Sequence, residues 1–235
     1  MIQNNLIHSS YENKVKKVIF LGSSCIYPKY AKQPIKEDYL LNGELESTNI
    51  AYAIAKISGL IMCDSYNKQY KNVTDFRCLM PTNLYGPGDN YHGLNSHVIP
   101  ALIKRFHKAK VSNQKSVKVW GNGEAKREFL YSEDLADAVV HIMKLSKLKN
   151  KKYLSLKSNH INIGSGQEYT IKKLAKIISK IIGYKGKIEF DKSKPNGTMR
   201  KYLSNQIMKK LGWKPSVKLQ DGILKTYKEF KKLDS

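Results

Sequence analysis

The sequence predicts an α/β fold built around a parallel sheet. Short apolar runs typical of buried strands alternate with longer segments whose apolar residues recur at helical spacing. Glycine and proline residues mark most of the boundaries between these segments. With 235 residues, of which 41% are hydrophobic, the chain can bury one large core or two small ones.

In the first half of the chain, two helical patterns alternate with two apolar strand patterns. Asn49 can cap the second helix, and Pro81 ends the second strand. Pro34 and Gly43 mark the long segment before that helix as a loop. The expected elements are a helix over 2–13, a strand over 17–21, a loop over 30–48, a helix over 49–70 and a strand over 73–80.

The second half continues the alternation. Pro100 falls in the first turn of a predicted helix, where its missing N–H is tolerated. Gly121-Asn-Gly123 breaks the strand that ends at Trp120, and apolar residues at helical spacing between 135 and 143 predict an amphipathic helix. The expected elements are a turn over 86–90, helices over 97–110, 133–148 and 170–182, strands over 115–120, 160–163 and 187–190, and two helices within 203–233.

The chain is strongly basic, with 42 Lys and Arg against 19 Asp and Glu and a net charge of +23. Such a charge is typical of nucleic-acid binding proteins. However, the lysines are spread along the chain, and neither a zinc-finger spacing nor an aromatic-basic RNA motif occurs. We therefore expect no nucleic-acid partner, with a basic nucleic-acid module kept as an alternative. The charge favours an acidic ligand such as a nucleotide diphosphate.

Targeting signals and cysteine usage indicate the compartment. No run of about 18 apolar residues occurs, and the first residues lack the basic and apolar regions of a signal peptide. The three cysteines Cys25, Cys63 and Cys78 are odd in number and have no metal-ligand spacing. We expect a cytoplasmic protein with reduced thiols, without a membrane partner, a disulfide framework or a metal site.

Arginine is rare in this chain, because only Arg77, Arg105, Arg127 and Arg200 occur among 42 basic residues. Each therefore marks a position where a planar guanidinium is hard to replace with lysine. Bidentate binding of phosphate is the leading use of that geometry. For Arg77, which follows Asp75 by two residues, a buried ion pair is an equally good interpretation.

Tyr52 and Lys56 lie four residues apart on a predicted helix and therefore share one face. There the ammonium can lower the pKa of the phenol and make it an acid near neutral pH. Upstream, an apolar strand runs into the turn Gly22-Ser23-Ser24, whose hydroxyls can meet the tyrosine. The combination indicates a tyrosine that can act as an acid beside the hydroxyls of this turn.

These motifs and the words around them carry a family resemblance. The chain resembles the GDP-L-fucose synthase family of the extended short-chain dehydrogenase/reductases, from Met1 to about residue 230. The matching words are GSSCIYP at 22–28, AYAIAK at 51–56, MPTNLYGP at 80–87, NSHVIPA at 95–101 and KPNGT at 194–198. The first and fourth are the most specific, and the others are shared more widely among nucleotide-sugar enzymes.

The resemblance implies a Rossmann-type doubly wound parallel sheet with a smaller α/β substrate domain. The NADP-binding domain would comprise 1–87 and 130–165, and the GDP-sugar domain 88–129 and 166–235. No glycine-rich phosphate turn follows an opening strand, and the glycines at 164 and 166 come too late. By the family's pattern the first βα units, roughly eighty residues, are missing. We expect a truncated gene, a misassigned start codon or a separate chain that supplies this segment.

The implied reaction is the NADPH-dependent conversion of GDP-4-keto-6-deoxy-mannose to GDP-L-fucose, by epimerisation at carbons 3 and 5 and reduction at carbon 4. Tyr52 would protonate the oxygen at carbon 4, Lys56 would hold the nicotinamide ribose, and Ser23 would bind the keto oxygen. Cys25 and His97 would exchange protons at carbons 3 and 5, where the neighbouring ketone acidifies the C–H bonds. The remaining histidines are expected to be structural or exposed.

Two alternatives remain open. A related nucleotide-sugar epimerase or dehydratase would keep Tyr52 and Lys56 but have no use for Cys25 and His97 as a pair. A catalytically inactive truncated remnant would bind nucleotide sugars or a partner subunit. The sequence also leaves open which of Ser23 and Ser24 faces the substrate.

The resemblance further implies the binding residues and a homodimer formed by the helix that carries Tyr52. Asn196 departs from the family, which usually has Asp there: an amide offers one acceptor and a donor, so guanine selectivity is less certain. The expected substrate-binding residues are Arg105, Trp120, Arg127, Asn196 and Lys201. The expected NADP(H)-binding residues are Leu21, Gly22, Ser23, Ser24, Lys56, Pro81, Thr82, Asn83, Leu84 and His97.

Overall fold

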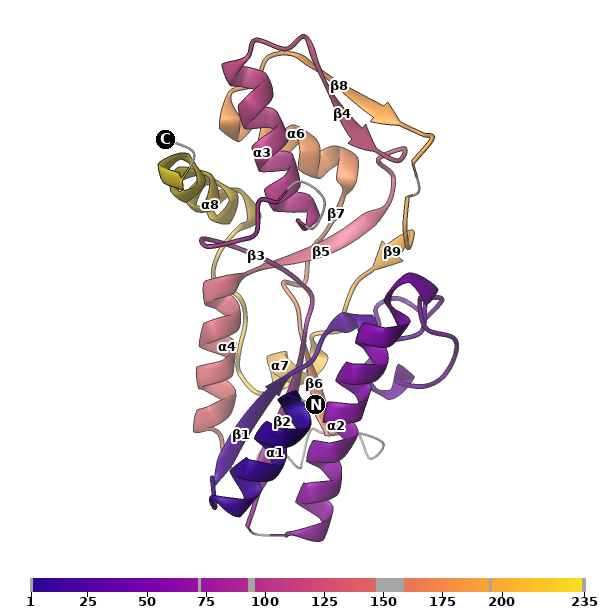
Figure 1. The fold of residues 1–235 in the computed structure, drawn as a ribbon, viewed down its shortest axis with the longest axis vertical. Helices are drawn as coiled ribbons and strands as arrows, with labels where there is room; N and C mark the ends of the chain where they lie inside the picture. Colours follow the sequence, from indigo (N-terminus) through magenta and orange to yellow (C-terminus); the bar gives the residue numbers. More distant parts are fainter. Residues whose placement is uncertain (1, 72, 93–95, 147–158, 195, 234–235) are drawn as a thin grey trace. The chain divides into compact units, whose positions relative to one another are not determined.

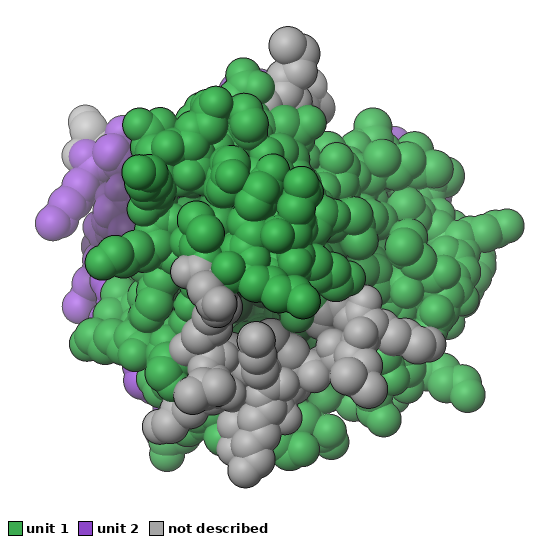
Figure 2. Space-filling view, turned by 90° about the horizontal axis from the view of Figure 1, so that it is seen from below, with its two compact units in different colours: residues 1–82, 135–166, 202–215 green, residues 83–134, 167–201, 216–235 purple. Residues whose placement is uncertain are grey.

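The computed structural model describes residues 2–71, 73–92, 96–146, 159–194 and 196–233. They form two compact units, which are coloured separately in Figure 2. Unit 1 comprises residues 1–82, 135–166 and 202–215, and unit 2 comprises 83–134, 167–201 and 216–235.

Unit 1 is built on a parallel three-stranded sheet with the strand order β1-β2-β6 (Figure 1). The strands are β1 (Lys17–Leu21), β2 (Asp75–Pro81) and β6 (His160–Ile163). The helices are α1 (Ile2–Glu12), α2 (Ile50–Gln69), α7 (Gln206–Lys210) and most of α4 (Ser132–Lys144). Helix α2 packs on β1 and β2, and α1 packs on α2.

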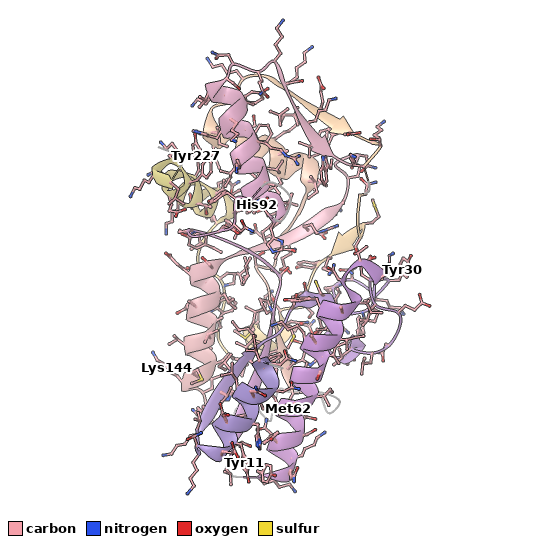
Figure 3. The ribbon with its side chains drawn as sticks, in the orientation of Figure 1. Tyr11, Tyr30, Met62, His92, Lys144 and Tyr227 are labelled. Carbon is pink, nitrogen blue, oxygen red and sulfur yellow. The ribbon has the colours of Figure 1, made fainter. Side chains whose placement is uncertain are left out.

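The core of unit 1 lies between the sheet and α2. Gly59 allows the close approach, because a Cβ at this position would lie 2.5 Å from Cζ of Phe20 on β1. Tyr11 of α1 and Met62 of α2, both labelled in Figure 3, pack against this core from the helical side. The third segment of the unit also contributes, since Leu203 is fully buried in the same cluster.

Unit 2 combines short sheets with three helices. Strand β5 (Lys126–Tyr131) pairs with β3 (Asn83–Tyr85) and β9 (Arg200–Lys201) in parallel and with β7 (Glu168–Thr170) in antiparallel. A second, two-stranded parallel sheet joins β4 (Ser116–Trp120) to β8 (Lys187–Asp191). The helices are α3 (Val98–Val111), α6 (Ile171–Ile182) and α8 (Leu219–Leu233).

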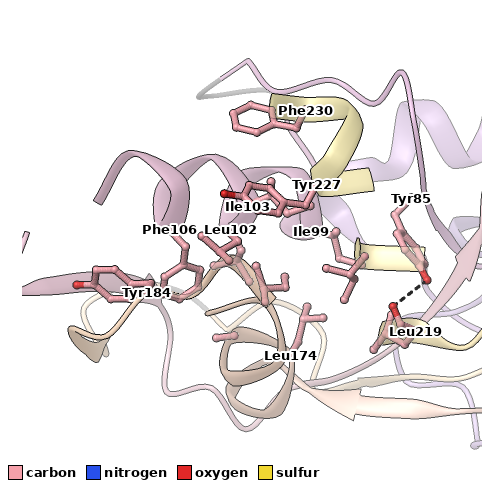
Figure 4. Close-up of a cluster of buried hydrophobic side chains, with 14 of the residues drawn as sticks. Tyr85, Ile99, Leu102, Ile103, Phe106, Leu174, Tyr184, Leu219, Tyr227 and Phe230 are labelled. Atoms are coloured by element: carbon pink, nitrogen blue, oxygen red, sulfur yellow. Dashed lines mark hydrogen bonds between the residues drawn. The ribbon is translucent and has the colours of Figure 1, made fainter. Parts of the chain in front are cut away.

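The core of unit 2 is formed where α3, α6 and α8 pack together (Figure 4). Phe106 and Leu174 are fully buried there. Tyr85 of β3 donates a hydrogen bond to the Leu219 carbonyl at the start of α8 (3.4 Å). Gly222 makes room for this ring, because a Cβ at that position would lie 2.3 Å from the Tyr85 hydroxyl oxygen.

The α/β class with parallel strands is confirmed, and the expected long elements are present. The differences lie in short segments: β3, β5, β7 and β9 were not expected, and Pro81 is the last residue of β2. The helix expected over 133–148 ends at Lys144, and 147–158 lie outside the described residues. The units depart from the expected domain boundaries chiefly at 202–215, which packs in unit 1 because Leu203 bridges to Ile35 and enters its core.

Candidate active site

In unit 1, the turn after β1 places two of the predicted catalytic side chains. The Gly22 amide donates to the Leu79 carbonyl of β2 (2.9 Å), and a Cβ here would lie 2.3 Å from Sδ of Met80. Glycine therefore keeps the turn flush with the end of the sheet. Ser23 then caps a single 3₁₀ turn, Ser24–Ile26, by accepting the Cys25 amide on its Oγ (3.2 Å).

Helix α2 brings the predicted acid to this turn. The Ser23 hydroxyl and Cys25 both lie close enough to the Tyr52 phenol to shift its pKa. Lys56, one helical turn later, donates from Nζ to the Leu21 carbonyl (2.9 Å). Its Nζ also lies 5.7 Å from the centre of the Tyr52 ring. Four predicted catalytic residues of unit 1 therefore meet at the end of β1.

The electrostatics of Tyr52 differ from the expectation. Burial raises the pKa of this phenol, the Ser23 hydrogen bond partly opposes the rise, and Cys25 adds to it. Lys56 does not contribute to the shift, and its ammonium donates to the Leu21 carbonyl. The hydroxyl of Ser23, rather than that of the buried Ser24, makes the contact with the phenol.

The predicted cofactor residues of unit 1 lie at the carboxyl ends of two neighbouring parallel strands. Leu21 to Ser24 follow β1, and Pro81 and Thr82 end β2, whose register pairs Leu21 with Leu79. The carboxyl edge is where doubly wound sheets bind dinucleotides. Half-exposed Tyr52 and the Lys56 ammonium border the same edge, so these residues fit a nicotinamide cofactor. Asn83 and Leu84 belong to β3 of unit 2.

Unit 2 contains a cavity of about 360 Å³ that gathers most of the other predicted residues. Its polar lining comes from β3, β4, β5, the start of α3 and the segment before β9. The predicted residues that line it are Asn83, His97, Arg105, Trp120, Arg127 and Asn196. This volume lies within the range of roughly 300–1,000 Å³ that is usual for small-molecule sites.

The cavity presents fixed positive charge beside an aromatic surface. The Arg105 guanidinium lies 5.2 Å from the centre of the Trp120 ring and donates to the Lys118 carbonyl (3.3 Å). Burial lowers the pKa of Arg127. Lys201 of β9 pairs in register with Arg127, so their side chains leave the same face of the sheet. A guanidinium and an ammonium side by side suit a diphosphate.

Asn196 uses its acceptor within the protein. Its Oδ1 accepts the Asn122 amide (2.8 Å), and its main-chain carbonyl accepts from Arg127 (3.5 Å). A ligand in the cavity therefore meets the amide NH₂ of Asn196 as a donor. The one acceptor oxygen of this side chain is already shared with the Asn122 amide, so it cannot accept both N–H groups of the guanine edge as a carboxylate would.

The structure adds one polar cavity residue that the sequence interpretation missed. Ser96 lines the cavity beside His97, and its buried Oγ has no hydrogen-bond partner among the described residues. The feature of the sequence that could have identified Ser96 is its place in the motif NSHVIPA. The apolar wall, formed by Val98, Leu102, Val119 and Ile171, comes from tertiary packing and carries no motif.

The four arginines divide into two kinds. Arg77 forms a bidentate pair with Asp75 and donates to the carbonyls of Ile142 and Leu145, so its buried ion pair is the correct interpretation. Arg200 pairs with Glu168 through two bonds of 2.7 and 2.8 Å. Arg105 and Arg127 are the two that line the cavity.

Across residues 2–233 with their gaps, no three His, Cys, Asp or Glu side chains gather in a metal-binding arrangement. Over the same residues, every helix is too short or too polar to span a bilayer.

Comparison with known proteins was made at the level of family, sequence and structure. Residues 1–164 match the model of the NAD dependent epimerase/dehydratase family. A GDP-L-fucose synthase from Escherichia coli is 51% identical over 98% of this chain, which spans 71% of that protein's length.

Two solved structures extend the likeness. A GDP-D-glycero-L-gluco-heptose synthase from Campylobacter jejuni, solved in the presence of NADPH, has 38% identity and a TM-score of 0.86 over 98% of this chain and 74% of its own. A GDP-L-fucose synthetase from Naegleria fowleri bound to NADP has 29% identity and a TM-score of 0.88 over 98% and 71%. The chain belongs to the NAD dependent epimerase/dehydratase family and, within it, to the group that contains the GDP-L-fucose synthases.

Proposed function

We propose that the chain converts GDP-4-keto-6-deoxy-mannose to GDP-L-fucose, epimerising carbons 3 and 5 and reducing carbon 4 with NADPH. The observation that carries the proposal is the group at the end of β1, where Ser23 accepts the Cys25 amide and both residues lie near enough to Tyr52 to shift the pKa of its phenol. A related epimerase or plain reductase needs the tyrosine and lysine. It has no chemical use for a thiol at this place together with a histidine that lines the cavity of unit 2.

The chain's own residues supply the proton chemistry in this proposal. The ketone at carbon 4 acidifies the C–H bonds at carbons 3 and 5, and a thiolate and an imidazole can exchange those protons near neutral pH. Cys25 and His97 take these roles. When bound, NADPH supplies a hydride to carbon 4. Tyr52 gives its proton to the oxygen at that carbon, and Ser23 holds the oxygen through its hydroxyl.

The two units divide the binding work. The carboxyl edge of the unit 1 sheet takes the nicotinamide end of the cofactor, and Lys56 holds its ribose. In unit 2, Arg105, Arg127 and Lys201 neutralise the diphosphate of the GDP-sugar, and the exposed indole of Trp120 packs on its base or ribose. The donor amide of Asn196 suits an acceptor on the ligand.

A homodimer through α2 is part of the proposal. The outward face of this helix is uncharged over several turns, with Ile54 54% exposed and Ile61 44% exposed. Ala51 and Ser58 complete the same face. An apolar helix face of this kind is stabilised when a second copy covers it. The alternative is that this face of α2 is covered by a separate chain that completes the cofactor site.

The proposed compartment is the cytoplasm. None of Cys25, Cys63 and Cys78 forms a disulfide, although Cys63 and Cys78 are hydrogen-bonded in the core. Thiols held this close stay reduced where glutathione and thioredoxin are active.

The test follows the substrate protons in deuterated water. Nuclear magnetic resonance of GDP-4-keto-6-deoxy-mannose with the chain is expected to show exchange at carbons 3 and 5, followed by NADPH oxidation. Cys25→Ser and His97→Asn are each expected to slow exchange by roughly 10²-fold or more. NADPH oxidation without exchange would instead indicate a plain reductase, and absence of both together with GDP binding would indicate an inactive remnant.

A further inference from the structure

A buried polar network lies directly behind the turn that carries Cys25. Its members are Tyr27, Glu37, His160 and Asn162, all of them buried in unit 1. Tyr27 follows Cys25 by two residues and closes the 3₁₀ turn as its C-terminal cap. Buried polar groups are retained where their hydrogen bonds fix one arrangement of the side chains. We therefore expect this network to hold the surrounding segments in place.

The hydrogen bonds of the network are short and complete. The Tyr27 hydroxyl donates to Oδ1 of Asn162 (2.6 Å) and lies 2.8 Å from Nε2 of His160. Because the hydroxyl proton is given to Asn162, the second bond requires an N–H on Nε2 of His160. Burial lowers the pKa of His160 to about 4, so this imidazole is neutral at physiological pH.

Asn162 anchors the network to the rest of unit 1. Its Nδ2 donates to the Ile35 carbonyl (3.0 Å), and its main-chain amide donates to Oε1 of Glu37 (3.0 Å). Ile35 in turn bonds the main chain of Tyr202 and Ser204 (both 2.8 Å). The Tyr27 ring is thus held by β6, by the loop before α2 and, through that loop, by the third segment of the unit.

The turn is therefore fixed at both ends. Ser23 holds the Cys25 amide on one side, and the ring of Tyr27 is locked on the other. Cys25 itself is only partly buried.

We propose that Tyr27 is a positioning residue, which holds the Cys25 thiol at the Tyr52 hydroxyl through its bonds to His160 and Asn162. Its catalytic consequence rests on the proposed function. The positioning itself does not, since the restraint acts on the thiol whether or not a substrate is turned over. Loss of either bond loosens the turn and changes how often the sulfur is presented to solvent.

The test measures alkylation of Cys25 by iodoacetamide in the full chain, across a pH series, with peptide mass spectrometry. Cys63 and Cys78 are buried, so their protection reports in the same experiment that the protein stays folded. In Tyr27→Phe the rate at Cys25 is expected to rise at least about threefold at every pH. Tyr66→Phe is the matched control, because it also removes one tyrosine–histidine bond in unit 1 (2.7 Å, to His8).

A second pair of variants separates positioning from simple loss of packing. His160→Gln retains an N–H for the Tyr27 oxygen and is expected to alkylate like the wild type. His160→Leu has no donor and is expected to behave like Tyr27→Phe. If Tyr27→Phe unfolds, exposed Cys63 and Cys78 reveal it, and the His160 pair then decides. Unchanged Cys25 rates in Tyr27→Phe and His160→Leu would overturn the inference, and the result does not depend on any enzymatic turnover.

Discussion

Arg127 and Arg200 have different partners, although they lie on the paired strands β5 and β9. Arg200 is neutralised by Glu168 in a bidentate pair, whereas Arg127 lines the cavity and makes its hydrogen bonds to main-chain carbonyls. Because arginine is rare in this sequence, both positions were predicted to require a planar guanidinium. Only the fold separates them, because the carboxylate that pairs with Arg200 lies 32 residues away.

We expect Arg127→Gln to weaken binding of GDP by roughly 10- to 100-fold, which corresponds to a loss of about 1.4–2.8 kcal/mol. A buried guanidinium bonds a diphosphate strongly, and glutamine keeps the polarity without the charge. Isothermal titration calorimetry measures the effect. Arg200→Gln is the control and should stay near the wild-type affinity. Equal losses in both variants would mean that the cavity is not the diphosphate site.

His160 gives the folded chain a defined acid sensitivity. Burial lowers its pKa to about 4, whereas the imidazole of an unfolded chain titrates near 6.5. Between these values the unfolded chain binds more protons, so stability falls as the pH is lowered through this window. Burial raises the pKa of Glu37, which therefore takes up a proton earlier in the folded chain and offsets part of the loss.

Urea denaturation near pH 7.5 and near pH 4 is expected to differ by on the order of 3 kcal/mol from His160 alone. His160→Gln keeps a donor for Tyr27 but cannot titrate, so the difference between the two pH values should shrink in this variant. The same pH dependence in both proteins would contradict the assignment of the effect to this imidazole.

Among the elements, helix α2 contributes both to the core of unit 1 and to the candidate active site. Its inward side meets β1 at Gly59 and Phe20, and its first turns carry Tyr52 and Lys56 to the end of the same strand. Any rotation or lift of α2 therefore moves the acid relative to Ser23. The spacing of the helix and the position of the GSS turn explain why sequence alone predicted this meeting.

Gly59→Ala should destabilise unit 1, even though alanine is the better helix former by about 1 kcal/mol. The new Cβ would lie 2.5 Å from the Phe20 ring, so the ring or the helix must move. We expect a net loss of about 1–3 kcal/mol in urea denaturation. Ser58→Ala on the exposed side of the same helix is the control. A gain of stability in Gly59→Ala would show that propensity outweighs the contact.

The elements that sequence missed are the ones that depend on distant partners. β3 and β7 have three residues each and β9 has two, too few to display an alternating pattern. All three exist because β5 pairs with them. The same reason applies to the candidate site: motif residues were predicted, whereas Ser96 and the apolar cavity wall follow from how α3 and α6 pack.

For the whole molecule, the predicted chemistry is shared between two units. Ser23, Cys25, Tyr52 and Lys56 belong to unit 1, and His97 belongs to unit 2 with the GDP-sugar residues. The net charge of +23 is consistent with acidic nucleotide ligands. The same charge makes two copies of the chain repel each other, so self-association depends on an uncharged surface.

Ile54→Glu is expected to shift the chain from dimer to monomer in analytical ultracentrifugation at micromolar concentration. The carboxylate would be placed in the centre of the apolar face of α2, where pairing with a second copy would bury it without a partner. Val140→Glu is the control, since Val140 of α4 is exposed to a similar degree, 49%. A wild-type chain that sediments as a monomer would contradict the proposed dimer.

The backbone passes from one unit to the other after residues 82, 134, 166, 201 and 215. Unit 1 therefore lacks its Leu203 anchor until residue 203 has been made, and unit 2 waits for α8. Neither half can be completed early during translation, and no single proteolytic cut releases one intact. Nascent chains stopped before residue 202 should consequently remain protease-sensitive throughout.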